Sequence, residues 1–201
     1  HPLLATRGVP GTHDIDLAIR TVEQLTAGED TQIPRFDKSI DDRVTGDKVE
    51  MHRGAVSLIV IEGWCWGATA QSESELQLPI NSLEKTEDSK GHWRHYINQS
   101  LAGNYQQLFA MVDQLIMLQA PSFDTVYNWR LEQESKLIEH LKSTANPAKS
   151  GLMSAQQIRR FIQYFQRITE HSLQEMPGRA QHLYQLDQQR NIINYKSQSV
   201  A

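Results

Sequence analysis

The chain has 201 residues, a formal net charge of −4 and a single cysteine. This length is that of one ordinary domain, and 39% hydrophobic with 22% charged residues is a composition typical of a globular protein. The longest apolar run, Val56 to Ile61, is far shorter than the roughly 20 residues that a membrane-spanning helix needs. The Lys and Arg residues are scattered and form no broad basic stripe. We therefore expect neither a membrane nor a nucleic acid as a partner.

The cysteine count and the first residue bear on the compartment and on the start of the chain. Because Cys65 is alone, no internal disulfide can form, which fits a reducing compartment, and we expect a cytoplasmic protein. The chain begins at His1 without an initiator Met and without the pattern of a signal peptide. We therefore expect that a segment upstream of His1 is missing.

Helical spacing of apolar residues predicts four helices. They cover residues 15–25, 98–112, about 122–142, and a long stretch that begins after Ser154 and stops at Pro177. Asp14, Ser122 and Ser154 are residue types that cap helix N-termini, and Gly28 ends the first helix. Three short apolar runs predict strands, over residues 56–61, 115–119 and, as a last edge strand, 182–187. Strands that alternate with helices indicate βαβ units with a parallel sheet, so the predicted class is α/β.

The predicted strands also place the expected site. In open α/β sheets, ligands lie outside the carboxyl ends of the strands. This rule puts Glu62–Trp64 and Gln119–Pro121 at the edge of that site. Residues 143–151, which include an Asn-Pro pair, predict a mobile loop.

The first segment with candidate chemistry is the N-terminal HPLLATRGVPGTHD, residues 1–14. Its glycines let the backbone approach a ligand closely, and it leads into the positive end of a helix dipole, where an anion is stabilised. Arg7, His13 and Asp14 are its polar candidates. The alternative is a glycine-rich turn followed by an Asp N-cap.

The second segment is IPRFDKSIDDR, residues 33–43, in which Arg35, Lys38 and Arg43 offer donors to a carboxylate or phosphate. The alternative is a solvated charged loop. The third is LIVIEGW, residues 58–64, where Glu62 ends the predicted buried strand. Nucleotide hydrolases and kinases keep a carboxylate that organises Mg²⁺ at such a position, although a strand-terminal Glu can also be satisfied by backbone donors alone.

Four motifs in order, HPLLATRGVPGTHD, IPRFDKSIDDR, LIVIEGWCWG and FDTVYNWRLEQE, resemble the D-glycerate 3-kinase branch of the P-loop kinases, which are related to uridine kinase, phosphoribulokinase and pantothenate kinase. The resemblance implies a kinase domain whose parallel sheet is flanked by helices, with a helical lid over about 122–175. The chain would be the C-terminal part of this domain. It also implies the cofactors ATP and Mg²⁺ and a phosphotransferase that acts on an alcohol group of a sugar acid, D-glycerate above all.

The resemblance further implies roles for individual residues. Arg7, His13 and Asp14 would line the acceptor site, and Arg35, Lys38 and Arg43 would bind its carboxylate or the transferring phosphate. Glu62 would support Mg²⁺ indirectly. Arg130 lies where related kinases begin their lid, so it would stabilise charge on the γ-phosphate, although an Arg whose stem packs along a core helix is the commoner case. Trp64 and Trp66 are expected to pack rather than to stack on a ligand.

The family pattern also has parts that this sequence lacks. No GxxxxGK[ST] loop occurs in the 201 residues, and neither does the Asp-Asp-Phe-Tyr strand end that precedes the His-Pro motif in family members. We expect these parts and the catalytic base to lie upstream of His1. We also expect the sheet to be incomplete without them and the chain alone to be inactive. Two alternatives stay open: a pantothenate- or nucleoside-type kinase of the same superfamily, and a non-catalytic kinase-like interaction domain.

Overall fold

The structure, a computed structural model, describes residues 1–38, 40–46, 49–143 and 152–198. Contacts within the chain divide it into two compact units. Unit 1 consists of His1–His13 and the chain from Trp64 onward, and unit 2 is Asp14–Gly63.

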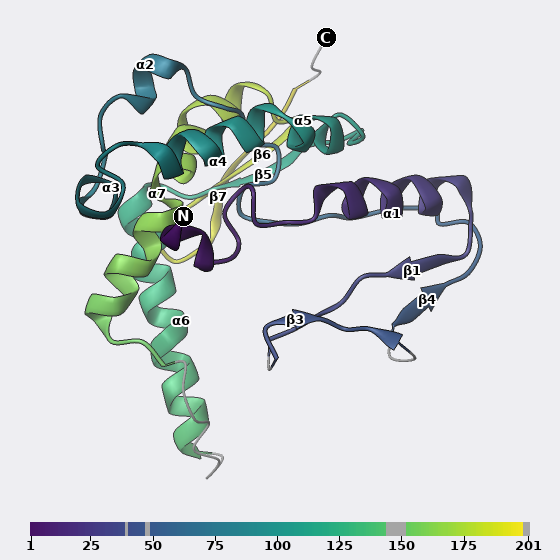
Figure 1. The fold of residues 1–201 in the computed structure, drawn as a ribbon, viewed down its shortest axis with the longest axis horizontal. Helices are drawn as coiled ribbons and strands as arrows, with labels where there is room; N and C mark the ends of the chain where they lie inside the picture. The colour runs from purple at the N-terminus through teal and green to yellow at the C-terminus, as the bar shows by residue number, and fades with distance from the viewer. Residues whose placement is uncertain (39, 47–48, 144–151, 199–201) are drawn as a thin grey trace. The chain divides into compact units, whose positions relative to one another are not determined.

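Unit 1 is built mainly of helices with one small sheet (Figure 1). Its helices are the 3₁₀-helix η1 (Pro2–Ala5), α2 (Glu73–Leu76), α3 (Ser82–Glu87), α4 (His92–Ala102), α5 (Asn104–Phe109), α6 (Phe123–Ser143), α7 (Ala155–Glu175) and the 3₁₀-helix η3 (Met176–Gly178). Its strands are β5 (Ile116–Gln119), β6 (His182–Leu186) and β7 (Ile192–Ser197). The long helices α6 and α7 lie side by side.

The sheet of unit 1 is mixed and has the order β5-β6-β7. Strands β5 and β6 are parallel, as the alternation of strands and helices predicts, whereas β6 and β7 are antiparallel. Met117 and Leu183 lie on its buried face with Met176. Residues 182–187 were expected to form an edge strand, but among the described strands β6 is central. That expectation is wrong because β7 pairs with the other side of β6. The residues of β7 are all exposed and show no apolar alternation, so the sequence did not reveal this strand.

The helix predicted over residues 98–112 is two helices. Apolar periodicity runs through Leu101, Tyr105 and Leu108, which are all buried, but the chain breaks at Gly103 with φ −92° and ψ −125°. Gly is tolerated at such a break because it has no Cβ. The helix α4 also starts earlier than expected, at His92. The periodicity therefore identified the buried face correctly but not the interruption.

The predicted helix caps are confirmed. The Ser122 hydroxyl accepts a hydrogen bond from the Thr125 amide at the start of α6. At the start of α7, Ser154 and Gln157 form a reciprocal capping box. Pro177 ends α7 in η3, as expected. In the predicted loop 143–151, residues 144–151 lie outside the described residues.

Two buried ion pairs hold the segment that contains α2 and α3 in unit 1. Glu84 is fully buried and receives two hydrogen bonds from Arg167 of α7, at 2.6 and 2.8 Å. Asp88 pairs with buried Arg94 of α4 at 3.0 Å. Both guanidinium groups also donate to backbone carbonyls, so these buried charges are paired and hydrogen-bonded.

Unit 2 contains the helix α1 (Ile15–Ala27) and four short strands, β1 (Thr31–Ile33), β2 (Phe36–Asp37), β3 (Asp42–Arg43) and β4 (Glu50–His52). The strands form two antiparallel pairs, β1 with β4 and β2 with β3. Helix α1 is capped by Asp14, whose Oδ1 accepts from the Leu17 amide, and it ends at Gly28 with φ +73°. The first predicted helix is thus confirmed with its two ends.

The strand predicted over residues 56–61 is wrong for this structure. No strand is assigned there, and Leu58 and Val60 are each 77% exposed. A strand exists only through hydrogen bonds to a neighbouring strand, and no described strand pairs with these residues. The described residues therefore form helices, one small mixed sheet and two antiparallel strand pairs rather than one parallel sheet.

Candidate functional site

The N-terminal loop, residues 1–13, is anchored in unit 1 by its own apolar side chains. Leu3, Val9 and Pro10 are buried. Gly8 and Gly11 have φ +99° and +88°, values that side chains other than glycine rarely adopt. A Cβ on Gly11 would lie 2.5 Å from Cε1 of Tyr96, so the loop needs glycine there. The sequence-based reading of this segment as a glycine-rich turn is confirmed.

Hydrogen bonds from distant parts of unit 1 fix the backbone of this loop. The Trp64 indole donates to the Gly8 carbonyl at 2.7 Å, and its ring packs edge-on against Phe165 at 5.0 Å. The Thr12 hydroxyl donates to the Val9 carbonyl and accepts from the Gly8 amide. Trp64 is therefore a packing residue, as expected. These hydrogen bonds restrain the loop that carries Arg7 and His13, and they need no ligand to form.

His13 is tied to Tyr105 of α5. Its Nδ1 lies 2.6 Å from the Tyr105 hydroxyl, which also accepts a hydrogen bond from the Gly11 amide at 3.0 Å. Burial of the ring atoms lowers the pKa of His13, although the residue as a whole keeps access to solvent. Burial raises the pKa of Tyr105 to about 12. His13 is therefore neutral and Tyr105 protonated near pH 7, and Arg7 on the same loop is exposed.

Asp14 and the cationic candidates belong to unit 2. The Asp14 carboxylate caps α1 through Oδ1 and pairs with Arg43 through Oδ2 at 2.8 Å. The N-cap interpretation of Asp14 is thus confirmed, and its carboxylate occupies the helix end where an anion was expected. Arg35 lies 3.8 Å from Glu50, with both side chains more than 60% exposed. Lys38 is exposed.

Glu62 is exposed at the end of residues 56–61. Among the described residues, no three His, Cys, Asp or Glu side chains gather closely enough to hold a metal ion. Mg²⁺ at phosphate-transfer sites commonly takes one or two carboxylates and completes its shell with substrate phosphates and water. A single accessible carboxylate such as Glu62 is compatible with that mode of binding.

Arg130 lies on α6 and forms an ion pair with Glu134 at 2.8 Å. Glu134 is buried and also accepts a hydrogen bond from the Met153 amide next to α7. The hydrogen bond from the Met153 amide, together with Arg130, holds the pKa of Glu134 below its ordinary value. The Arg130 guanidinium lies 5.9 Å from the centre of the Phe161 ring. Arg130 therefore has a structural role between α6 and α7 in this structure.

Arg130 also lines a groove of about 530 Å³ along α6. Trp129, Lys136 and Arg190 line it as well, and this volume lies within the usual range for small-molecule sites. The Trp129 indole donates to the Gln188 carbonyl in the β6–β7 turn, and Arg190 of that turn lies over the Trp129 ring. Arg190 and Lys136 both pair with Glu132. The lining of the groove therefore contains one aromatic ring, three cationic side chains and one partly exposed carboxylate, that of Glu132.

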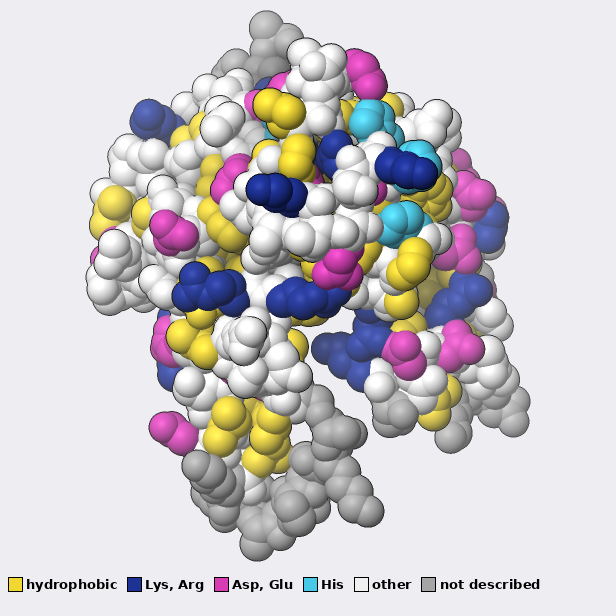
Figure 2. All heavy atoms as spheres, turned by 60° about the vertical axis from the view of Figure 1, so that its left-hand side comes forward, with side chains coloured by type: hydrophobic (Ala, Val, Ile, Leu, Met, Phe, Trp, Pro, Cys, Tyr) yellow, Lys and Arg dark blue, Asp and Glu magenta, His cyan; other side chains and the backbone are white. Residues whose placement is uncertain are grey.

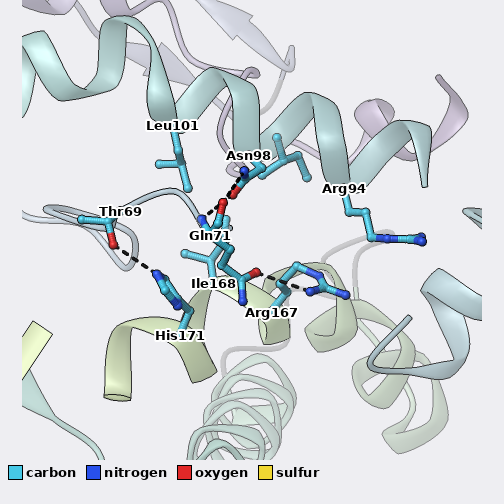
Figure 3. A pocket seen from close by; sticks show the side chains of 9 residues that line it. Thr69, Gln71, Arg94, Asn98, Leu101, Arg167, Ile168 and His171 are labelled. Atoms are coloured by element: carbon cyan, nitrogen blue, oxygen red, sulfur yellow. Dashed lines mark hydrogen bonds between the residues drawn. The ribbon is translucent and has the colours of Figure 1, made fainter. Parts of the chain in front are cut away.

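A second pocket lies between α4 and α7, where Figure 3 shows Thr69, Gln71, Asn98 and His171 with their hydrogen bonds. Its volume of about 10 Å³ is enough for a water molecule and too small for a substrate. The Gln71 backbone amide donates to Asn98 and the Thr69 hydroxyl lies 3.1 Å from His171, so these four residues of the lining bond to one another in pairs.

Figure 2 shows Lys and Arg side chains interspersed with acidic ones over the face it displays, as the scattered sequence positions predict. Within the described ranges, no helix combines the length and apolar character that crossing a membrane requires. Cys65 is buried, and burial raises the pKa of its thiol to about 11, as expected for an inert cysteine.

Three residues that the structure places next to candidates were not among the residues predicted for the site. Tyr105 was assigned only to the apolar face of a helix, and Trp129 and Arg190 were not considered. The partners of Tyr105 lie 92 and 94 residues away along the chain, so no local pattern could have paired them. The Asp187-Gln188 turn signal beside Arg190 was available but not used.

No protein-family model matches the chain. Over 146 residues the chain is 30% identical to an uncharacterized kinase, mug58, of Schizosaccharomyces pombe. The matched region makes up 68% of the chain and 51% of that kinase. It is 29% identical over 142 residues to the chloroplastic D-glycerate 3-kinase of Arabidopsis thaliana. This matched region makes up 66% of the chain and 28% of that enzyme. The chain thus spans about half the length of one of these relatives and about a quarter of the other.

Two solved structures are similar to this one. The D-glycerate 3-kinase of Cryptococcus neoformans var. grubii matches with a TM-score of 0.74 and 25% identity, over 98% of this chain and 70% of that one. The YGR205w protein matches with a TM-score of 0.72 and 21% identity, over the whole chain and 69% of that protein. The second likeness concerns the fold alone.

Proposed function

Because the chain belongs to the D-glycerate 3-kinase-like family, we propose that the full-length protein is a kinase that uses ATP and Mg²⁺ to phosphorylate a hydroxyl of a small sugar acid, with D-glycerate as the acceptor. The observation that carries the proposal is the likeness to two proteins named D-glycerate 3-kinase, one by sequence and one by structure. The exposed cations among the candidate residues suit an acceptor with a carboxylate.

Such a reaction needs positioning and charge neutralisation more than covalent chemistry from the protein. A bond forms between the acceptor oxygen and the γ-phosphorus, the bond to the ADP oxygen breaks, and the acceptor hydroxyl gives up its proton. We propose that Arg7 and His13 of unit 1 contact the acceptor. The pre-formed loop that carries them supports this role, because a rigid loop loses little freedom when a ligand binds.

From unit 2, we propose that Arg35, Lys38 and Arg43 supply positive charge to the acceptor carboxylate or the transferring phosphate. Their exposure leaves the guanidinium and ammonium groups accessible to a ligand. Asp14 orients Arg43 through their ion pair, and Glu62 supports Mg²⁺ through its ligand water. Mg²⁺, when bound, would neutralise phosphate charge.

We propose that Arg130 stabilises charge on the transferring phosphate, and that α6 and α7 form the lid, over about residues 122–175. The groove along α6 supports this role because Arg130, Lys136 and Arg190 line it together. The ion pair of Arg130 with Glu134 fixes the direction of the guanidinium rather than removing its charge.

The direct test assays the full-length protein with ATP and Mg²⁺ against D-glycerate, pantothenate and uridine. We expect ATP turnover that depends on D-glycerate. Absence of turnover with every acceptor would contradict the kinase proposal and favour the non-catalytic alternative. Turnover only with pantothenate or uridine would retain the kinase and replace the acceptor.

A further inference from the structure

The Tyr105 hydroxyl makes two recorded hydrogen bonds in unit 1, one to the Gly11 amide and one to Nδ1 of His13. An amide N–H can only donate, so the hydroxyl oxygen accepts from Gly11. The hydroxyl has one proton to give, and Nδ1 of His13, 2.6 Å away, is placed to accept it. A nitrogen that accepts a hydrogen bond carries no proton, so in this arrangement the proton of the neutral imidazole is on Nε2.

We propose that Tyr105 is a positioning residue that fixes His13 as the neutral tautomer with its proton on Nε2, so that His13 donates a hydrogen bond to the acceptor and is not the base that removes its proton. The inference rests on the proposed function, because His13 is assigned to the acceptor there. It deepens that function by giving His13 one of two roles that a catalytic histidine can have.

The surroundings of His13 favour this tautomer over the charged imidazolium. With a protonated Nδ1, the hydroxyl oxygen would accept a second hydrogen bond beside that from the Gly11 amide, and the hydroxyl proton would need an acceptor other than Nδ1. Burial of the ring lowers the pKa of His13, and the raised pKa of Tyr105 keeps its proton in place. The donor role is therefore available throughout the range near neutral pH.

The same hydroxyl couples the tautomer to the backbone of the loop. Gly11 is hydrogen-bonded to Tyr105 through its amide and to Tyr96 through its carbonyl, at 3.0 and 3.3 Å. Both tyrosines thus hold one glycine, but only Tyr105 also reaches His13. Tyr96→Phe is therefore a matched control for Tyr105→Phe, because it removes a hydroxyl that bonds to the same loop and leaves the hydrogen bond between Tyr105 and His13 intact.

The first test observes the tautomer directly by ¹⁵N NMR of the His13 ring in the 201-residue chain. In the parent and in Tyr96→Phe we expect Nε2 to give the signal of a protonated nitrogen and Nδ1 that of an unprotonated one. In Tyr105→Phe we expect the two signals to move toward each other as both tautomers become populated. A parent spectrum with the proton on Nδ1, or a Tyr105→Phe spectrum identical to the parent, would overturn the inference.

The second test separates donor from base in the full-length kinase. The amide nitrogen of Gln reaches the position of Nε2 and can only donate, whereas that of Asn reaches the position of Nδ1. We expect His13→Gln to retain kcat within about tenfold and His13→Asn to raise the KM for the acceptor by about tenfold. A loss of 10² to 10⁴ in kcat for His13→Gln would show that His13 is the base and overturn the donor role.

The two tests contradict different claims. A full-length protein with no acceptor-dependent turnover would contradict the proposed function and with it the donor role, whereas the ring spectrum still decides whether Tyr105 sets the tautomer. Normal turnover with an unchanged spectrum in Tyr105→Phe would leave the proposed function standing and overturn the inference.

Discussion

The N-terminal loop of unit 1 and the cationic segment of unit 2, residues 33–43, present their candidate side chains in opposite ways. The loop buries three of its own side chains, accepts a hydrogen bond from the Trp64 indole at the Gly8 carbonyl, and donates one from the Gly11 amide to the Tyr105 hydroxyl. In the cationic segment Phe36 and Ile40 are exposed, and Arg35 has an ion pair 3.8 Å long with Glu50. Exposed pairs of this kind contribute about 0 to 1 kcal/mol to stability.

The difference indicates two kinds of contribution to a ligand site. A rigid loop fixes direction and hydrogen-bond polarity, since its groups are held before the ligand arrives. An exposed charged segment supplies attraction and can adapt, because an exposed ion pair as long as that of Arg35 with Glu50 restrains a side chain only weakly. Substitutions in the loop should therefore cost stability as well as binding, whereas substitutions in the cationic segment should cost binding alone.

The largest expected effect on stability comes from Gly11→Ala. Its Cβ would meet Tyr96 and Ser100 at 2.5 and 2.9 Å, at a backbone φ of +88°. Strain and overpacking together should lower the free energy of unfolding by about 2 to 4 kcal/mol, measured by urea denaturation. Gly54→Ala is the control, because Gly54 also has a positive φ, +79°, but no atom within 4 Å of its Cβ position.

The Gly54 variant should lose only roughly 1 kcal/mol, from backbone strain alone. Equal losses in the two variants would show that the loop is not tightly packed and would remove the contrast between the two regions.

A smaller effect, on binding alone, is expected from Arg35→Ala or Lys38→Ala. Loss of a charge-assisted hydrogen bond costs about 1.5 to 3 kcal/mol, so the KM for an anionic acceptor should rise roughly tenfold or more. The KM for ATP and the free energy of unfolding should hardly change. Arg20→Ala, which removes an exposed cation from α1 of the same unit, should leave both KM values as they are. Equal increases in the two KM values would contradict the assignment of these cations to the acceptor.

The smallest effect concerns pH. Burial lowers the pKa of His13 from its ordinary value of 6.5, so the folded protein binds this proton less readily than the unfolded chain. The contribution of the neutral His13 to the free energy of unfolding is therefore complete above about pH 6.5, and it is lost as the pH falls toward the pKa of the folded state. Tyr105 and Tyr96 are the titratable neighbours on the helices packed against this loop, and burial raises the pKa of Tyr105 to about 12.

An NMR titration of the His13 ring should accordingly give a midpoint below 6.5. A midpoint at or above that value would show that the ring is as well solvated as the residues of the cationic segment.

Local chemistry explains what the sequence predicted well. Asp14, Ser122 and Ser154 act on amides within three residues of themselves, so their caps could be identified from the residue types alone. Gly103 escaped prediction because the apolar spacing of Leu101 and Tyr105 continues across it.

Long-range pairing explains what the sequence did not reveal. Residues 56–61 have the composition of a strand, but a strand also needs a partner, which composition cannot supply. Tyr105 on a buried helix face is typical of packing, and only the folded chain brings its hydroxyl to His13. The motif resemblance gave Arg130 a role at the phosphate, whereas the hydrogen bond of its partner Glu134 with the Met153 amide depends on where the chain before α7 lies.

The central claim, that the full-length protein phosphorylates a small sugar acid, is tested most directly by identifying the product. The protein is incubated with ATP, Mg²⁺ and equal concentrations of D-glycerate, pantothenate and uridine, and the products are separated and examined by ³¹P NMR. We predict a phosphate monoester on a hydroxyl of D-glycerate, formed in step with ADP. Phosphorylated pantothenate or uridine as the main product, or ADP without any phosphorylated acceptor, would contradict the account.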